Sequence, residues 1–261
     1  MKVALIISTY NNPSSLELVL ISVLNQTVLP FELIVADDGS TNETKKLIKK
    51  YKSRFTIPLY HMWHEDRGFR KTVILNKSIV YAKSDYIIQI DGDVILNSKF
   101  IQDHLSSAKK MTFSHGSRVL LNIKLTQSLI SNKSIFLPKL SFFQYKNFFN
   151  SIRIPILYKF QFYNKNLKGT RGCNFSFFKK DFLKVNGYNE DIIGWGKEDS
   201  ELSARFLNIG LKKQKLKFIA IMYHLFHDSQ SRNMLDANKK ILEKTITEKL
   251  IYCENGCSKY I

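Results

Sequence analysis

The chain has 261 residues, of which 44% are hydrophobic, and its formal net charge is +18. This length suffices for one large domain with a substantial core, and the apolar content excludes an intrinsically disordered chain. Apolar runs are too short for a secretory signal or for the roughly 20 residues that span a bilayer, so we expect a cytoplasmic protein with a basic surface for a polyanion.

Apolar runs alternate with helical patterns through the first part of the chain. The β-branched composition of the runs predicts strands, and Pro13 opens the first helical pattern. Alternating strands and helices with near-continuous apolar strands predict an α/β fold whose parallel sheet is covered on both faces. We expect strands at 3–8, 33–36, 58–63 and 86–91, and helices from residue 13, at 44–51 and at 69–82.

The rest of the chain divides into an irregular segment and a patterned one. Residues 104–168 mix aromatic residues with Asn and Lys, and we expect broken helices and loops there. The three cysteines lack the spacing of a metal site, which favours free thiols in a reducing compartment. After residue 169 we expect strands at 173–178 and 215–222, and helices at 179–185, 198–207 and 238–251.

Polar residues follow each of the first four predicted strands. Because the carboxyl ends of parallel strands meet at one edge of an open sheet, where ligands bind, we expect these residues to lie together. They are Ser8-Thr9-Tyr10-Asn11, Asp37-Asp38-Gly39-Ser40, His64-Glu65-Asp66-Arg67 and Asp91-Gly92-Asp93.

The sequence Asp91-Gly92-Asp93 ends the most apolar strand. Carboxylates beside a buried strand are costly unless compensated, and a divalent cation that bridges to phosphate oxygens would compensate them; an ordinary turn is the other interpretation. Glycine-rich phosphate loops are missing, so a cation on Asp93, helped by Arg67, Arg70 or Lys71, would have to hold any phosphate.

Two further groups carry chemistry. His224 and His227 are three residues apart and could chelate a metal, although an isolated histidine is more often a surface residue. An imidazole suits Mn²⁺ better than Mg²⁺. Trp195 is flanked by glycines and followed by Glu198 and Asp199; an indole can stack on a pyranose, whereas paired carboxylates also suit the first turn of any helix.

Together these motifs resemble family 2 glycosyltransferases with the GT-A fold. The segment from Gly172 to Asp199 resembles the acceptor half of β-1,4-galactosyltransferases and of bacterial chondroitin-polymerase-like enzymes. The resemblance implies a Rossmann-like, mostly parallel sheet flanked by helices, with a helical and loop acceptor subdomain. It divides one GT-A domain into a nucleotide-sugar half (1–103), a basic aromatic-rich segment (104–168) and an acceptor and catalytic half (169–261).

The resemblance also implies roles by position. Asp199 would be the general base and Glu198 would orient the acceptor, while Asp93 and His227, with His224 as a second candidate, would bind Mn²⁺ or Mg²⁺. The acceptor or sugar would be contacted by Gly194, Trp195, Gly196 and Asn174. The nucleotide sugar would be bound by Thr9, Tyr10, Asn11, Asp38, Asp66, Arg70, Asp91 and Gly92, with Asp38 accepting from the base N–H.

The implied reaction is metal-dependent transfer of a hexose or N-acetylhexosamine from a UDP-sugar to a hydroxyl group. A single attack inverts the anomeric carbon and gives a β-glycoside. The acceptor would be a glycan or lipid-linked glycan of a capsule, lipopolysaccharide or similar surface polymer, and the resemblance of the acceptor half favours galactose or N-acetylgalactosamine as the sugar.

The basic charge is concentrated in one segment. Between Asp103 and Asp181 there are fourteen Lys and Arg and no acidic residue. This segment predicts contact with an anionic membrane at its inner face or with an acidic acceptor, or else a solvated lysine face. A nucleic-acid-binding protein is a second hypothesis, which the acidic strand ends oppose; a nucleotidyltransferase, a third, would need a glycine-rich loop after the first strand.

Overall fold

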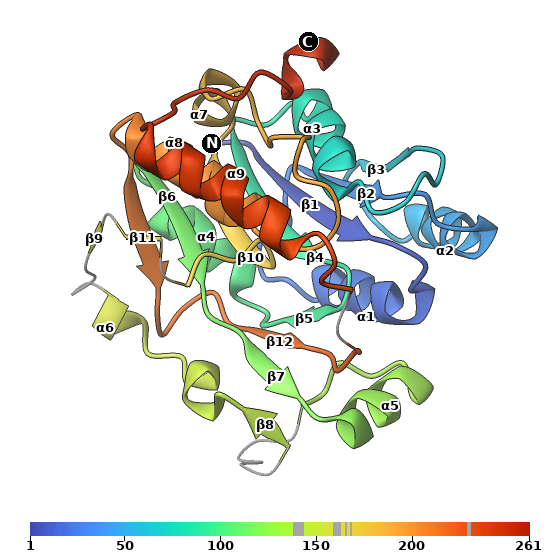
Figure 1. Cartoon of the computed structure of the whole chain (residues 1–261). Helices are drawn as coiled ribbons and strands as arrows, with labels where there is room; N and C mark the ends of the chain where they lie inside the picture. Colours follow the sequence, from blue (N-terminus) through green and yellow to red (C-terminus); the bar gives the residue numbers. More distant parts are fainter. Residues whose placement is uncertain (138–143, 159–162, 165, 168, 229–230) are drawn as a thin grey trace.

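A computed structural model describes residues 1–137, 144–158, 163–164, 166–167, 169–228 and 231–261 (Figure 1). A sheet of eight strands runs through the centre, in the order β3-β2-β1-β4-β10-β6-β11-β9. The strands are β1 (Val3–Thr9), β2 (Glu32–Asp37), β3 (Leu59–Trp63), β4 (Tyr86–Asp91), β6 (Thr112–Gly116), β9 (Tyr163–Asn164), β10 (Asn174–Phe178) and β11 (Lys212–Leu216).

Strand β1 shows why the predicted strands are apolar along their whole length. Val3, Leu5 and Ile7 face one hydrophobic cluster, while Ala4 and Ile6 face another. The first cluster takes in side chains of α1 (Pro13–Leu24), α2 (Asn42–Lys52) and α4 (Phe100–Ser107). The second takes in those of α3 (Lys71–Tyr81), α7 (Lys179–Lys184) and α8 (Glu198–Asn208). Both faces of the sheet are therefore covered, as the sequence predicted.

The sheet is mixed rather than wholly parallel. Strands β1 to β4 pair in parallel, but β10 runs antiparallel between β4 and β6. The predicted α/β fold with a mostly parallel sheet is confirmed, and the antiparallel β10 marks the join between its two halves. This strand brings the start of the C-terminal half directly beside the end of β4.

The predicted strand at 215–222 is wrong, because the chain turns within it. Strand β11 ends at Leu216, and Phe218 and Ala220 adopt positive φ angles of 66° and 50°. The N–H of Ala220 donates to Oδ2 of Asp103 at 2.9 Å, which holds the turn. The chain then enters a different sheet as β12 (Met222–His224), and this step carries the two histidines to the end of β4.

A second sheet of four strands lies beside the ends of β1 and β4 (Figure 1). Its order is β5-β12-β7-β8, from β5 (Val94–Leu96), β7 (Val119–Leu121) and β8 (Tyr145–Lys146) together with β12. A third hydrophobic cluster joins it to α5 (Ile123–Ser131). The remaining elements of 104–168, η1 (Phe148–Ser151) and α6 (Pro155–Tyr158), are as short and broken as predicted, and the expectations for 138–143, 159–162, 165 and 168 lie outside the described residues.

The C-terminal part returns across the second face of the main sheet. Helix α9 (Leu235–Thr247) packs on α8 and is shifted from the predicted 238–251, because Lys249 turns with φ 51° and the Leu250 N–H returns to the Thr245 carbonyl. The final turn η2 (Cys257–Tyr260) packs against α3. All three cysteines are buried and free. In the described part of the chain, every helix is too short or too polar to cross a lipid bilayer.

Candidate active site

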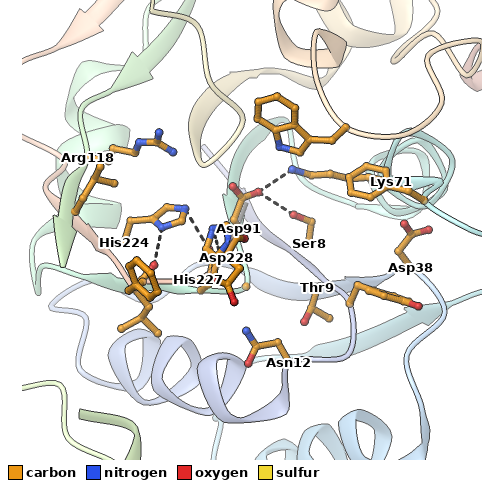
Figure 2. A pocket seen from close by; sticks show the side chains of 18 of the residues that line it. Ser8, Thr9, Asn12, Asp38, Lys71, Asp91, Arg118, His224, His227 and Asp228 are labelled. Atoms are coloured by element: carbon orange, nitrogen blue, oxygen red, sulfur yellow. Dashed lines mark hydrogen bonds and ion pairs between the residues drawn. The ribbon is translucent and has the colours of Figure 1, made fainter. Parts of the chain in front are cut away.

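A cavity of about 1330 Å³ opens at the carboxyl ends of β1, β2 and β4. Its walls come from these strand ends, from β7, β8 and β12 of the second sheet, and from the segments 194–195 and 231–234. Figure 2 shows polar side chains from these elements pointing into one space. The predicted convergence of strand ends is thus extended by a second wall, made of residues of β7 and β8 that the sequence did not indicate.

The ends of β1 and β2 supply one polar end of the cavity. Oγ1 of Thr9 is buried and has no hydrogen-bond partner among the described residues. Both carboxylate oxygens of Asp38 are engaged, Oδ1 with Nε2 of His64 at 2.6 Å and Oδ2 with the N–H of Arg70 at 2.9 Å. Asp38 is therefore held in one orientation, and Thr9 offers an unused hydroxyl beside it.

Asn11, Asp66 and Arg70, which the sequence assigned to nucleotide binding, support this end of the cavity but do not line it. Asp66 accepts a hydrogen bond from the hydroxyl of Tyr10 at 2.8 Å, and Tyr10 does line the cavity. Asn11 joins two loops, because its N–H donates to Oγ of Ser40 and its Oδ1 accepts from the N–H of Thr41. The guanidinium of Arg70 donates to the Glu65 carbonyl at 2.6 Å. These residues shape the rim of the cavity.

Asp91 is held by a lysine that the sequence indicated only as one of three phosphate helpers. Lys71 Nζ lies 2.8 Å and Ser8 Oγ 3.1 Å from Oδ1 of Asp91. Burial opposes ionisation of Asp91, but the charge and hydrogen bond of Lys71 outweigh it and lower the pKa of this carboxyl. The adjoining Gly92 is required, since a Cβ there would lie 2.9 Å from the Ser8 carbonyl oxygen.

Asp93 meets His224 and His227 at the centre of the cavity. Nε2 of His224 lies 3.5 Å from Oδ1 and Nε2 of His227 lies 3.3 Å from Oδ2 of this carboxylate. The Nδ1 atoms of the two rings lie 2.9 Å and 2.7 Å from the backbone carbonyls of Leu225 and Asp228. A carbonyl only accepts, so each Nδ1 carries a proton and each Nε2 faces the carboxylate of Asp93.

This cluster fits a divalent cation. Oδ1 of Asp93 is buried without a hydrogen-bond partner among the described residues. Burial raises the pKa of Asp93, the nearby charge of Asp91 raises it further, and the two histidines only partly oppose this. One ligand atom from each of Asp93, His224 and His227 lies within 4.8 Å of the others. Two imidazoles and one carboxylate are a donor set that suits Mn²⁺.

Helix α8 begins with the second carboxylate pair. The N–H of Gly172 donates to Oδ2 of Asp199 at 2.6 Å, and the hydroxyl of Tyr188 donates to Oδ1 at 3.1 Å. A Cβ on Gly172 would lie 2.4 Å from Asp199 Oδ1, so only glycine allows this approach. Glu198 and Asp199 are not among the residues that line the cavity, but Lys71 lines it and its charge acts on both.

Burial sets the protonation of this pair. It raises the pKa of Glu198 to about 7, helped by the charge of Asp199 and opposed by Lys71. It also raises the pKa of Asp199, with Lys71 the main opposing charge. Oε2 of Glu198 is buried without a partner among the described residues. The arrangement provides a carboxylate whose pKa is close to neutral, which suits proton transfer.

Trp195 forms part of the cavity wall and is 39% exposed. Positive φ angles at Gly194, Gly196 and Lys197, of 72°, 104° and 79°, bend the loop around it. The guanidinium of Arg232 lies 5.5 Å from the centre of the indole ring. Gly194 lines the cavity, whereas the Gly196 carbonyl accepts from Asn238 at 3.0 Å and fixes the loop to α9.

The predicted role of Asn174 is wrong. Its side chain is fully buried at the start of β10. Its amide nitrogen donates to the carbonyls of Ser117 and Ala220 at 3.1 Å and 2.9 Å, and its Oδ1 lies 3.0 Å from Nε2 of His104. These three partners use the hydrogen-bonding groups of the amide, so it ties the two sheets together and has nothing left for an acceptor.

Sequence reasoning missed the basic residues of the second wall. Arg118 and Lys146 line the cavity from β7 and β8, together with Asn122 and Gln144. The acid-free composition of 104–180 was the available signal, but no motif places these residues beside Asp93.

Two family models match the sequence. "Glycosyl transferase family 2" matches residues 4–182, and "N-terminal domain of galactosyltransferase" matches residues 156–228. The first match therefore covers more than half of the chain, including all strand ends of the cavity from β1 to β4. The second covers the start of α8 and reaches His227.

Individual relatives are distant. The chain is 22% identical over 249 residues to the chondroitin synthase of Escherichia coli, a match that covers 85% of this chain and 34% of that protein. It is 25% identical over 242 residues to the poly(ribitol-phosphate) beta-N-acetylglucosaminyltransferase TarP of Staphylococcus aureus, covering 91% and 67%. The chain thus spans about a third of the length of the chondroitin synthase.

Solved structures share the fold. S. aureus TarS 1–349 in complex with UDP superposes with a TM-score of 0.65 at 14% identity, covering 100% of this chain and 68% of that one. The mannosyltransferase PcManGT of Pyrobaculum calidifontis, in complex with GDP-Man and Mn²⁺, gives a TM-score of 0.57 at 16% identity, covering 85% and 56%.

Proposed function

Since this chain belongs to glycosyl transferase family 2 and has the GT-A fold, we propose that it moves a hexose or N-acetylhexosamine from a UDP-sugar to a glycan hydroxyl, with inversion and with the help of a divalent cation. The acceptor in this proposal is a surface glycan, free or lipid-linked. The cavity carries the proposal, because it joins a polar end at β1 and β2 to a cation-binding cluster, and because Lys71 in its wall acts on the buried carboxylate pair of Glu198 and Asp199 behind it.

We assign the nucleotide to the polar end of the cavity, which the carboxyl ends of β1 and β2 form. Asp38, fixed by His64 and Arg70, accepts the N–H of the uracil base, and the unpaired Thr9 hydroxyl bonds the base or ribose. Asp91 bonds a hydroxyl of the ribose or sugar. The S. aureus TarS structure with UDP supports the choice of nucleotide.

Asp93, His224 and His227 would hold the cation, preferably Mn²⁺. When bound there, a divalent cation offsets the negative charge that gathers on the departing diphosphate. Lys71 supplies a positive charge beside Asp91. Burial lowers its pKa, but the charges of Asp91, Asp199 and Glu198 together raise it by more.

Asp199 is assigned the role of general base. The acceptor oxygen attacks the anomeric carbon on the face opposite UDP, the bond from that carbon to the diphosphate oxygen breaks, and the hydroxyl proton passes to Asp199. Gly172 and Tyr188 hold this carboxylate in one orientation. Glu198 positions the acceptor, and Trp195 stacks on its ring.

The change Asp199→Asn tests this assignment. An amide of the same shape cannot take the proton, so we expect transfer to fall by roughly 10²-fold or more while UDP affinity stays within about twofold. Release of UDP and calorimetric UDP binding are the two measurements. Asp236→Asn, in the first turn of α9 and exposed, is the matched control; transfer by Asp199→Asn at the rate of this control would remove Asp199 from the role.

The two other hypotheses from the sequence are set aside. Family membership makes the chain a glycosyltransferase, and the carboxylates of the cavity would repel a nucleic-acid backbone. We retain contact with the inner face of an anionic membrane as part of the proposal, since lipid-linked acceptors lie there and since exposed apolar side chains gather in the basic segment. These are Phe136, Phe149, Ile156 and Leu157.

A further inference from the structure

The second wall of the cavity is basic where the first is acidic. It is formed by β7 and β8 and the residues beside them, and these belong to the stretch between Asp103 and Asp181 that has fourteen Lys and Arg and no acid. Among the described residues, Arg118 and Lys146 are the charged side chains that this wall presents to the cavity. Base, ribose and cation present no negative charge to these side chains, so the basic wall points to an anionic ligand group.

Arg118 lies in this wall without a counter-ion. It is half-buried, its Nε is buried without a hydrogen-bond partner, and no hydrogen bond or ion pair of its guanidinium occurs among the described residues. Removing a cation from water without pairing it is unfavourable. In Figure 2 the guanidinium extends into the cavity with His224 on one side of Asp91, while Thr9 and Asp38 lie on the other side.

The backbone around Arg118 is fixed. The carbonyl of Ser117 accepts from Asn174 at 3.1 Å, and the carbonyl of Arg118 accepts from Asn150 at 3.0 Å. A Cβ on Gly116 would lie 2.0 Å from the Asn174 amide, so β6 and β10 are in close contact at this point. Arg118 therefore lies in a short link between β6 of the main sheet and β7 of the second sheet, and both strands hold its backbone in place for binding.

Arg171 lies beside the strand that leads to Arg118. Its N–H donates at 3.2 Å to Nδ1 of His115, which lies three residues before Arg118. Burial lowers the pKa of Arg171, and the positive charge of Arg118 lowers it further. Like charges repel, and an anion between them would remove the repulsion. Arg171 also directly precedes Gly172, whose N–H holds Asp199. The two arginines thus adjoin the carboxylate that receives the acceptor proton.

We propose that Arg118, with Arg171 and Lys146 beside it, binds a negatively charged group of the acceptor, a carboxylate or a phosphate on the glycan. This inference rests on the proposed function of the same cavity and adds the class of acceptor to it. An arginine fork pairs with two oxygens of either group. The cation at the Asp93 cluster is proposed to bind the donor diphosphate. Arg171, in contrast, directly precedes Gly172, whose N–H donates to Asp199, the proposed base for the acceptor hydroxyl. This position favours the acceptor as the source of the anion.

The test uses protein saturated with UDP and Mg²⁺, so that the place of the diphosphate is filled. Calorimetry compares a tetrasaccharide containing hexuronic acid with its carboxyl-reduced counterpart, and a glycerol-phosphate oligomer with neutral glycerol. We expect at least one acidic ligand to bind about tenfold or more tightly than its neutral partner, and Arg118→Gln to remove that difference. The pair that shows the difference tells carboxylate from phosphate.

Control variants distinguish binding at Arg118 from general attraction of anions by the basic segment. Lys110→Gln removes an exposed lysine of the same acid-free segment outside the cavity and should keep the preference for the acidic ligand. Arg118→Lys keeps the charge but loses the fork, so its affinity should fall between those of the wild type and Arg118→Gln. Thermal unfolding confirms that each variant is folded.

Three results would overturn the inference. They are equal binding of acidic and neutral ligands by the wild type, equal losses in Arg118→Gln and Lys110→Gln, and a tenfold loss of UDP affinity in Arg118→Gln, which would assign the guanidinium to the diphosphate. The titrations are repeated without UDP. Failure of the wild type to bind UDP would refute the proposed donor, while the anion preference is still measured.

Discussion

At the scale of single residues, the site is built from polar groups that the protein leaves without partners. Oγ1 of Thr9, Oδ1 of Asp93, Oε2 of Glu198 and Nε of Arg118 are all buried and have no hydrogen-bond partner in the described part of the chain. Such groups destabilise a fold unless a ligand satisfies them. Thr9, Asp93 and Arg118 line one cavity and Glu198 lies behind Lys71 of its wall, and these positions mark where base, cation and acceptor are proposed to bind.

Glu198 should lower stability at alkaline pH. Burial raises its pKa to about 7, above the value of an unfolded chain. Its contribution to stability is therefore present at pH 4 and below and is lost as the pH rises through about 7. We expect Glu198→Gln to be more stable than wild type at pH 8, by on the order of 2 kcal/mol, and to show little gain at pH 4.

Denaturant unfolding at the two pH values measures this difference. Glu243→Gln, on α9 and exposed, is the comparison variant and should change stability little at either pH. A gain for Glu198→Gln that is the same at pH 4 and pH 8 would contradict a raised pKa for this carboxyl.

At the scale of elements, α8 positions Asp199 and is anchored by a fully buried ion pair. Arg205 Nε and Nη2 donate to the two oxygens of Glu201 at 2.8 Å and 2.6 Å, and Nη1 donates to the Val185 carbonyl at 2.5 Å. The Thr245 hydroxyl of α9 donates to the same carboxylate at 3.1 Å. The pair thus joins α8 to α9 and to the end of α7.

Removing one partner of this pair should be costly. Arg205→Met leaves the carboxylate of Glu201 buried without its cation, and we expect a loss of about 3–5 kcal/mol in the free energy of unfolding. Thr245→Val removes one hydrogen bond from the same group and should cost about 1 kcal/mol. Urea unfolding measures both, and equal, small losses would show that the pair does not anchor α8.

Elements that depend on local pattern were predictable, and elements that depend on distant contacts were not. Strands β1, β2 and β4 are close to their predicted bounds because each is a short apolar run that ends in polar residues, and α8 is close to its bounds because Gly210 follows its end. The turn after β11 escaped prediction, since Phe218 and Ala220 take positive φ without glycine and the turn is held by Asp103.

The same distinction explains which residues of the site could be predicted from the sequence. Asp93, His224 and His227 could be named from motifs, and they lie together, whereas Asn174 was misassigned because its partners Ser117 and Ala220 are distant in sequence. Arg118 carried no motif, so only the fold brings it to the cavity. The roles of all these residues remain proposals.

At the scale of the whole molecule, charge is divided between an acidic strand edge and a basic segment. Asp38, Asp91 and Asp93 of the cavity lie at the ends of β2 and β4, and the acid-free segment supplies β7 and β8 of the second sheet beside them (Figure 1). Phe136 and Phe149 of this segment are 88% and 76% exposed. Exposed apolar side chains among lysines are typical of a surface that rests on anionic lipid.

Binding to vesicles tests this surface. We expect the protein to float with liposomes that contain anionic lipid and not with neutral liposomes, and less so at high salt. The double change Phe136→Ser and Phe149→Ser should weaken flotation several-fold, whereas Trp63→Ser, at an exposed aromatic residue of β3, should not. Equal and negligible flotation with both kinds of vesicle would remove the membrane from the proposal.

The central claim is that Asp93 and the two histidines bind the cation of a nucleotide-sugar complex. Anomalous diffraction from crystals grown with Mn²⁺ and UDP tests it most directly. The account predicts one manganese peak within about 2.0–2.4 Å of an Asp93 carboxylate oxygen and of Nε2 of His227 or His224, next to the UDP phosphates. UDP bound in the cavity with no manganese peak beside Asp93, or with the peak on other residues, would contradict it.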